Sequence, residues 1–271
     1  MKFHTHYWNQ SGRAILVTLV GLLLSLGAMQ SVQANEITPP KMDGAPLILG
    51  AGVVYRDKVY KGYDDDEKAQ AIPLVLWEND TFFVRASSVG WKLVSNESWE
   101  VAAIGEFHGE GYDSSDSDFL EGMRDREQSF NGGAQLTYKF GNGFCLRGTW
   151  VADISNEHDG YQTRGEAFYV HRAGNWAIRP SVGVVYTSDD YTDFYYGVQQ
   201  NEAIAGVRDF YRPDGETSYR GSVVALWNPG GSKWQVVAGG IFDAYGDEID
   251  DSPIVDDSTM FTGFLALGYR F

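Results

Sequence analysis

Few residues of this chain could act as a general base or a nucleophile. Beyond residue 34 the sequence contains three histidines and one cysteine, at His108, His158, His171 and Cys145. The only grouping that resembles a hydrolytic site is His108 followed by Asp113, Asp116 and Asp118, because a histidine among aspartates can activate water. No serine stands in a position that would suit a lipid-cleaving serine–histidine pair. We therefore expect no catalytic residues, no enzyme activity and no cofactor.

Acidic residues gather in short clusters between the more regular parts of the sequence. The clusters are Asp64–Glu67, Asp113–Asp118, Asp250–Asp251 and Asp256–Asp257. A calcium loop of the EF-hand type needs acidic ligands at a fixed spacing around a glycine and a closing glutamate, and this spacing is absent. Two interpretations stay open, namely solvated loops that repel one another and weak divalent-cation binding beside a lipopolysaccharide-rich surface. No defined metal site is predicted.

The charge balance excludes several classes of protein. The 271 residues carry a net charge of -16 at pH 7. The first 34 residues contain Lys2 and Arg13 and no acid, so the remainder has 21 - 2 = 19 basic residues against 37 acidic ones, or -18. Such a chain lacks the basic face that a nucleic-acid-binding protein requires. A single cysteine also excludes an internal disulfide.

The first 34 residues have the pattern of a secretory signal peptide. Lys2 and Arg13 form the positive region, 14–29 form a short apolar run, and cleavage is predicted after Ala34. A membrane-anchor helix is the alternative, but the apolar run is short for a span. We expect residues 35–45 to be a periplasmic segment and 46–271 to form the main domain.

The main domain alternates apolar and polar residues, which is typical of strands that have one apolar face. In the last strand one face carries Phe261, Leu265, Leu267, Tyr269 and Phe271, and the other face is mostly small or polar. Similar segments of 11 to 13 residues recur upstream, longer than the strands of soluble sandwiches and suited to a tilted membrane crossing. The final aromatic residues, Tyr269 and Phe271, are expected to serve as the signal that the barrel assembly machinery reads.

Aromatic residues cluster at both ends of these segments, as expected where a barrel meets two membrane interfaces. A soluble β-sandwich is the alternative, and it explains neither the segment length nor the two aromatic belts. Short turns such as 95–98, 141–143, 173–174 and 228–232 alternate with longer connections. Outer-membrane barrels have short periplasmic turns and longer external loops. The sequence thus predicts an all-β, antiparallel transmembrane barrel of the cell outer membrane with long acidic external loops.

The strand count depends on residues 46–94. The segments 46–56 and 69–77 are predicted strands, and 81–94 holds either one strand or a short hairpin broken near Ser87 and Ser88. An even count with both termini in the periplasm favours the hairpin. We predict 12 strands, with 10 as the alternative if part of 46–94 lies outside the wall.

The inward face of the predicted strands is polar and carries both signs of charge. The lumen charges predicted from the alternation are Glu100, Glu106, Lys139, Arg147, Asp153, Arg164, Glu166, Arg179, Arg220, Asp243 and Arg270. Buried charges must pair, so the favoured interpretation is a salt-bridged and largely filled lumen. The alternative is a narrow pore lined by arginines. Cys145 falls on the same inward face, where a small packing residue is more common than a reactive thiol.

Several short motifs, in their order and spacing, resemble the MipA/OmpV family of outer-membrane proteins. The motifs are Gly50–Tyr55 with Tyr60–Tyr63, Ile72–Leu74 with Phe82–Phe83, Tyr195–Val198 with Glu202, Ala203, Tyr211 and Gly215, then Asp251–Val255 and Gly268–Phe271. The resemblance covers most of the chain beyond residue 34. It implies a non-enzymatic outer-membrane barrel without catalytic residues.

Three functions follow as hypotheses. The first, implied by the resemblance, is a scaffold that joins murein hydrolase and murein synthase activities. The second is a passive porin-like channel for small solutes, and the third is a surface adhesin that acts through the external loops. The expected partners are outer-membrane lipid and lipopolysaccharide, the barrel assembly machinery and, for the scaffold, a murein hydrolase or synthase. No nucleic acid is expected as a partner.

Overall fold

A single antiparallel sheet dominates the computed structural model, which describes residues 47–63 and 69–271. Its strands are β1 (Ile48–Arg56), β2 (Ala69–Glu78), β3 (Phe82–Arg85), β4 (Ser88–Ser95), β5 (Trp99–His108), β6 (Ser129–Lys139), β7 (Phe144–Asp153), β8 (Tyr161–Tyr169), β9 (His171–Ala173), β10 (Trp176–Thr187), β11 (Glu216–Trp227), β12 (Trp234–Ala244) and β13 (Thr259–Arg270). The short helices α2 (Asp189–Tyr196) and α3 (Asp247–Asp250) and the turn η2 (Pro229–Gly231) lie in connections.

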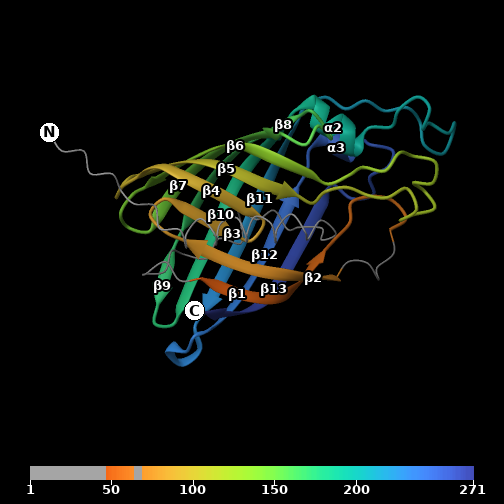
Figure 1. The fold of residues 1–271 in the computed structure, drawn as a ribbon. Coiled ribbons are helices and arrows are strands. Elements are labelled where there is room, and N and C mark those ends of the chain that lie inside the picture. Colours follow the sequence, from red (N-terminus) through yellow and green to blue (C-terminus); the bar gives the residue numbers. More distant parts are fainter. Residues whose placement is uncertain (1–46, 64–68) are drawn as a thin grey trace.

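The sheet closes on itself to form a barrel (Figure 1). Its first and last strands pair in antiparallel register, from Ile48 opposite Arg270 to Arg56 opposite Thr262. Strands β8 and β9 both pair with β10 and are separated only by Val170, so they act as one strand of the wall. The barrel therefore has twelve wall strands, which confirms the predicted fold class and strand number. Closure pairs the first strand with the last, so these two strands have no free edge. Within the described residues β2 pairs with the short β3 only from Leu76 to Glu78, so the external part of β2 is paired on its β1 side alone.

The region 81–94 forms the short hairpin that the even strand count favoured. β3 and β4 are joined at Ala86 and Ser87, and Ala86 takes a positive φ of 52° that closes the turn tightly. Because β3 has only four residues, this hairpin turns on the external side of the barrel well below the rim. This turn is therefore short and external, unlike the four short turns at 95–98, 141–143, 173–174 and 228–232.

Inward and outward faces follow the predicted alternation. In β13 the side chains of Phe261, Leu265 and Leu267 are exposed on the outer wall, whereas Thr262 and Phe264 are buried on the inner face. Rings pack against one another at the end of this strand, with Trp234 and Tyr269 centroids 5.2 Å apart and Tyr269 and Phe271 centroids 5.1 Å apart. The exposed apolar side chains therefore meet lipid rather than water.

Two of the expected segments, the signal peptide at 1–34 and the periplasmic segment at 35–45, lie outside the described residues. Within 47–63 and 69–271 no helix is both long and apolar enough to cross a membrane. In Figure 1 the two helices α2 and α3 sit together at one end of the barrel, and β9 and the C-terminus lie at the opposite end. The long connections are thus external and the C-terminus is periplasmic.

The position of Cys145 gives a direct test of this topology. Cys145 is the second residue of β7, directly after the periplasmic turn, and it shares the inward parity of Arg147. A bulky, membrane-impermeant thiol reagent applied to intact cells should therefore leave Cys145 unlabelled, whereas the same reagent should label unfolded protein. Efficient labelling from outside, measured by mass shift, would show that the strand phase or the orientation is wrong.

Candidate functional site

The inward charges form ion pairs along the barrel wall. The pairs are Arg85–Glu78 (2.9 Å), Arg85–Glu100 (3.6 Å), Lys92–Glu78 (2.5 Å), Lys139–Glu100 (3.6 Å), Arg164–Glu106 (2.7 Å), Arg147–Glu166 (3.8 Å), Arg179–Glu166 (2.6 Å) and Arg220–Asp243. All but one of these pairs join adjacent or next-but-one strands, and the exception is Arg164 of β8 with Glu106 of β5, which are three strands apart. This arrangement follows from the closed sheet, which places alternate residues of neighbouring strands on one face.

Glu166 of β8 occupies the centre of one such group. It lies directly across the sheet from Arg147 of β7. Arg179, which is only 2 % exposed, approaches from β10 and donates from Nη2 to both carboxylate oxygens at 2.6 Å. Phe168 supports both arginines, since the guanidinium carbons of Arg147 and Arg179 lie 4.9 and 4.2 Å from its ring centroid. One carboxylate is therefore shared between two buried cations.

Three charges of this network were not among the predicted lumen residues. Glu78, Arg85 and Lys92 lie on β2, β3 and β4, the region where the strand count was open and the inward phase could not be assigned. Lys92 and Arg85 both form ion pairs with Glu78. The short hairpin therefore contacts β2 through these ion pairs as well as through backbone hydrogen bonds. Once the hairpin is placed, the same alternation rule identifies all three.

The prediction that Asp153 pairs with an arginine of the lumen is wrong. Its carboxylate accepts hydrogen bonds from the backbone nitrogens of Ser155, Glu157, His158 and Asp159, and so organises the external loop after β7. Its inward parity is as predicted, but it lies at the end of the strand, where loop amides are closer than any arginine. Arg270, at the opposite rim, is the last residue of β13 and is half-buried.

External loops pack into one hydrophobic cluster, which we call the cap. The cap comprises the described loop residues 57–63, 109–128, 188–215 and 245–258. Its buried side chains are Val59, Tyr60, Tyr112, Leu120, Met123, Tyr191, Tyr195, Tyr196, Val198, Ile249, Ile254 and Val255, together with Met260 of β13. Backbone bonds link separate loops, for example from Asp256 to Val59 (2.7 Å) and from Lys61 to Ile254 (2.9 Å). Buried aromatic area on this scale is a strong source of stability.

Three of these loops reach one another from evenly spaced points on the rim. They follow β1, β5 and β10, which are four strands apart around the twelve-strand wall. Yet the rings of Tyr60 and Tyr112 lie 4.7 Å apart, those of Tyr60 and Tyr196 lie 6.0 Å apart, and Tyr191 contacts His108. Loops that start a third of the circumference apart can make such contacts only by reaching over or into the external mouth. The cap therefore extends across the external opening.

A buried hydrogen-bonded group holds the cap to the top of β5. Tyr191 donates its hydroxyl hydrogen to Glu110, so its oxygen is left to accept from Nε2 of His108 at 2.6 Å. The same nitrogen lies 3.2 Å from the Glu110 carboxylate. Burial alone would raise the pKa of Glu110, but the charge and hydrogen bond of His108 outweigh it and lower that pKa to about 2. Glu110 is thus an anion at neutral pH, and the pKa of Tyr191 is raised by burial and by this neighbour.

The grouping of His108 with Asp113, Asp116 and Asp118 does not assemble. His108 faces Tyr191 and Glu110, whereas Asp116 accepts a hydrogen bond from the hydroxyl of Tyr63. Asp118 is exposed. Among the described residues no group of three or more histidine, cysteine or acidic side chains is arranged to hold a metal ion.

His158 makes the cap sensitive to acid. It is 4 % exposed and its ring packs against Tyr191 at 5.0 Å. Burial lowers its pKa to about 4; Asp153, Glu110 and Asp159 raise that pKa but do not offset burial, and His108 lowers it further. Because an unfolded histidine titrates near 6.5, the unfolded chain binds more protons between these values, and stability should fall as pH drops from about 6.5 to 4.

We expect protease cleavage within the cap to accelerate over this pH interval, and His158→Gln to weaken that dependence. His171→Gln, at an exposed site on β9, serves as the control and should keep the wild-type slope. An unchanged slope in His158→Gln would assign the acid response to other groups.

Comparisons with known proteins identify a family and individual relatives. A family model described as MltA-interacting protein MipA matches residues 49–271. The MltA-interacting protein of Escherichia coli K12 is 29 % identical over 256 residues, which cover 92 % of this chain and 98 % of that protein. Outer membrane protein OmpV of Vibrio cholerae is 25 % identical over 211 residues, covering 77 % and 80 %. Among solved structures, the NanC porin matches with a TM-score of 0.41 and 10 % identity, over 83 % of this chain and 100 % of that one.

Proposed function

Because this chain belongs to the family of MltA-interacting protein MipA, we propose that it is a non-enzymatic scaffold that binds a murein-acting enzyme at the periplasmic face. Its fold and relatives make it a β-barrel protein of the outer membrane. One relative is named for an interaction with MltA. A scaffold of this kind needs an anchored barrel and a periplasmic contact surface, and it needs no catalytic group of its own.

The observation that supports a scaffold over an open channel is the cap. Three loops that start four strands apart meet through Tyr60, Tyr112 and Tyr191 at the external mouth. A passive channel needs a continuous aqueous path, and a packed aromatic cluster across one mouth opposes it. Because the cap disfavours passage of solutes, binding of a partner protein at the periplasmic end is the function that fits both the barrel and the family.

A positive stretch of the periplasmic rim offers a contact surface. Lys233 beside β12 and Arg270 on β13 lie on adjacent strands, and Arg172 on β9 lies at the same end of the wall beyond β10 and β11, in a protein whose net charge is -16. Arg172 and Lys233 are exposed. A charged patch of this kind raises the rate of association with a partner of opposite sign. We therefore expect the bound enzyme to present an acidic surface.

Binding can be measured with the detergent-purified barrel immobilised on a sensor and the lytic transglycosylase of the same organism as analyte. We expect specific binding by the wild type and about tenfold weaker binding, equal to about 1.4 kcal/mol, by the double variant Arg172→Glu and Lys233→Glu. The matched control Arg212→Glu changes a charge on an external loop and should bind normally. Failure of the wild type to bind, or equal weakening by the control, would contradict the proposal.

A further inference from the structure

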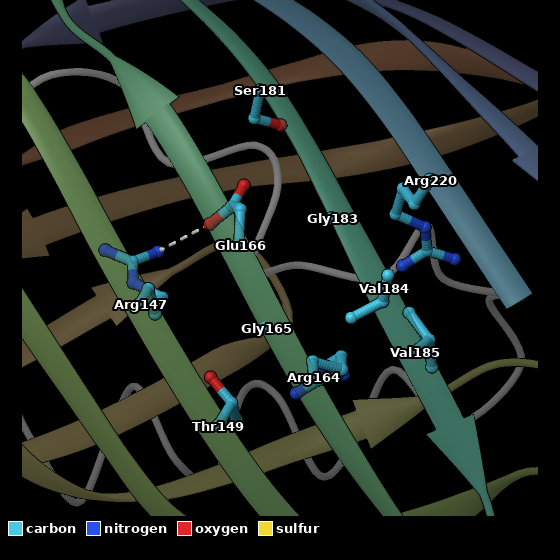
Figure 2. A pocket seen from close by; sticks show the side chains of 10 residues that line it. All are labelled: Arg147, Thr149, Arg164, Gly165, Glu166, Ser181, Gly183, Val184, Val185 and Arg220. Carbon is cyan, nitrogen blue, oxygen red and sulfur yellow. Dashed lines mark ion pairs between the residues drawn. The ribbon is translucent and has the colours of Figure 1, made fainter. Parts of the chain in front are cut away.

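A small cavity in the lumen has three arginines among the residues that line it. Its volume is about 40 Å³, and its polar lining comes from Arg147, Thr149, Arg164, Glu166, Ser181 and Arg220. Figure 2 shows Arg147, Arg164 and Arg220 on three strands around it, with the Arg147–Glu166 ion pair on one side. A space of this size holds a few water molecules or one small anion.

The acidic side chains in and around this cavity are each paired with an arginine, and none of them hydrogen-bonds Arg147. Arg164 holds Glu106 at 2.7 Å, and Arg220 holds Asp243. Both oxygens of Glu166 are bound by Nη2 of Arg179 at 2.6 Å, so Arg147 is left at 3.8 Å from that carboxylate. Nη1 of Arg147 is buried and makes no hydrogen bond to any described residue.

The local charge is therefore unbalanced. Among the residues that the structure describes here, Arg147, Arg164, Arg179 and Arg220 carry four positive charges against three negative ones from Glu106, Glu166 and Asp243, so this set has one positive charge in excess. The Arg147 side chain is only 7 % exposed. A buried cation without full compensation is costly, and an anion beside it removes that cost.

We propose that this cavity is an anion-binding site of the lumen and that it takes the carboxylate group of a small solute. A guanidinium edge matches the two oxygens of a planar carboxylate, and the single excess charge matches one carboxylate. Thr149 adds a hydroxyl whose oxygen accepts from Gln135 at 3.3 Å, so its own hydrogen can point to the ligand. The site is independent of the scaffold surface, because it lies inside the barrel on β7, β8, β10 and β11.

The test uses the thermal unfolding midpoint of the whole barrel in detergent, with acetate replacing chloride or sulfate at constant ionic strength. We expect the midpoint to rise with acetate in the wild type and to be insensitive to it in Arg147→Gln. Arg212→Gln removes one positive charge from an exposed external position and should respond like the wild type. An equal response to acetate in Arg147→Gln would overturn the proposal.

A second variant distinguishes the loss of an anion site from a general folding defect in Arg147→Gln. Glu166→Gln removes the carboxylate that competes for Arg147, so the half-saturating acetate concentration should fall about tenfold. A purely structural role for Arg147 predicts no such gain. If Glu166→Gln loses stability and acetate does not restore it, the site is refuted. A response to chloride as strong as that to acetate would refute the proposed preference for a carboxylate.

Discussion

The Arg179→Ala variant should lose about 3–5 kcal/mol of unfolding free energy, because it removes both arginine hydrogen bonds from the buried Glu166 carboxylate and leaves only the longer ion pair with Arg147. Arg179 is 2 % exposed and supplies the only hydrogen bonds from an arginine to Glu166 among the described residues. Arg147, at 3.8 Å from that carboxylate, is too distant to replace them. The loss can be measured by urea unfolding in detergent, followed by heat-modifiable migration on gels.

Two controls separate charge from packing at this position. Arg172→Ala removes an exposed arginine from the periplasmic end of the same part of the wall and should cost no more than about 1 kcal/mol. Arg179→Ala combined with Glu166→Gln should regain part of the loss, because no buried carboxylate then lacks its arginine hydrogen bonds. A loss below about 1 kcal/mol in Arg179→Ala would mean that water reaches Glu166 and that the lumen is hydrated at this level.

Tyr191→Ala should open the cap. Truncating a buried aromatic residue typically costs about 3–5 kcal/mol, and Tyr191 is 2 % exposed and packs against His108, His158 and Tyr195. Its loss also leaves the buried carboxylate of Glu110 without its hydroxyl donor. We expect little conductance from the wild-type barrel in planar bilayers and clear conductance from Tyr191→Ala, with faster protease cleavage of the external loops.

Tyr191→Phe is the matched control for this change. It keeps the ring contacts and removes only the hydrogen bonds to Glu110 and His108, so it should stay closed at neutral pH. Clear conductance from the wild type would defeat the closed-mouth argument and favour a solute channel. Equal, low conductance from wild type and Tyr191→Ala would instead place the barrier elsewhere in the barrel.

The two predictions concern different layers of the molecule. Arg179 and Glu166 stabilise the wall in the lumen, whereas Tyr191 and Glu110 hold the external loops together. The anion site proposed at Arg147 belongs to the first layer, and the periplasmic rim proposed as the enzyme contact lies beyond it. A variant in one layer should therefore leave the readout of the other unchanged, since distant sites act additively.

Sequence alone was enough to establish the barrel. The period-two alternation assigns each strand residue to one face because it follows from backbone geometry within a single strand. The faces predicted for β13, with Phe261 and Leu265 outward and Thr262 inward, are the faces that the structure has. Segment length, the aromatic belts and the even strand count led to a twelve-strand wall for the same reason: each depends on local pattern and on bilayer thickness.

Only the tertiary structure decided which charges meet and which loops touch. Arg147, Arg179 and Glu166 share a face by parity, yet their unequal distances depend on the register between three strands and on the packing of Phe168. The contact of Tyr191 with Glu110 joins loops 81 residues apart in the chain, and no local pattern encodes it. Alternation is a property of one strand, whereas pairing and loop closure are properties of the closed sheet, so the sequence specifies the face of each side chain but not its partner.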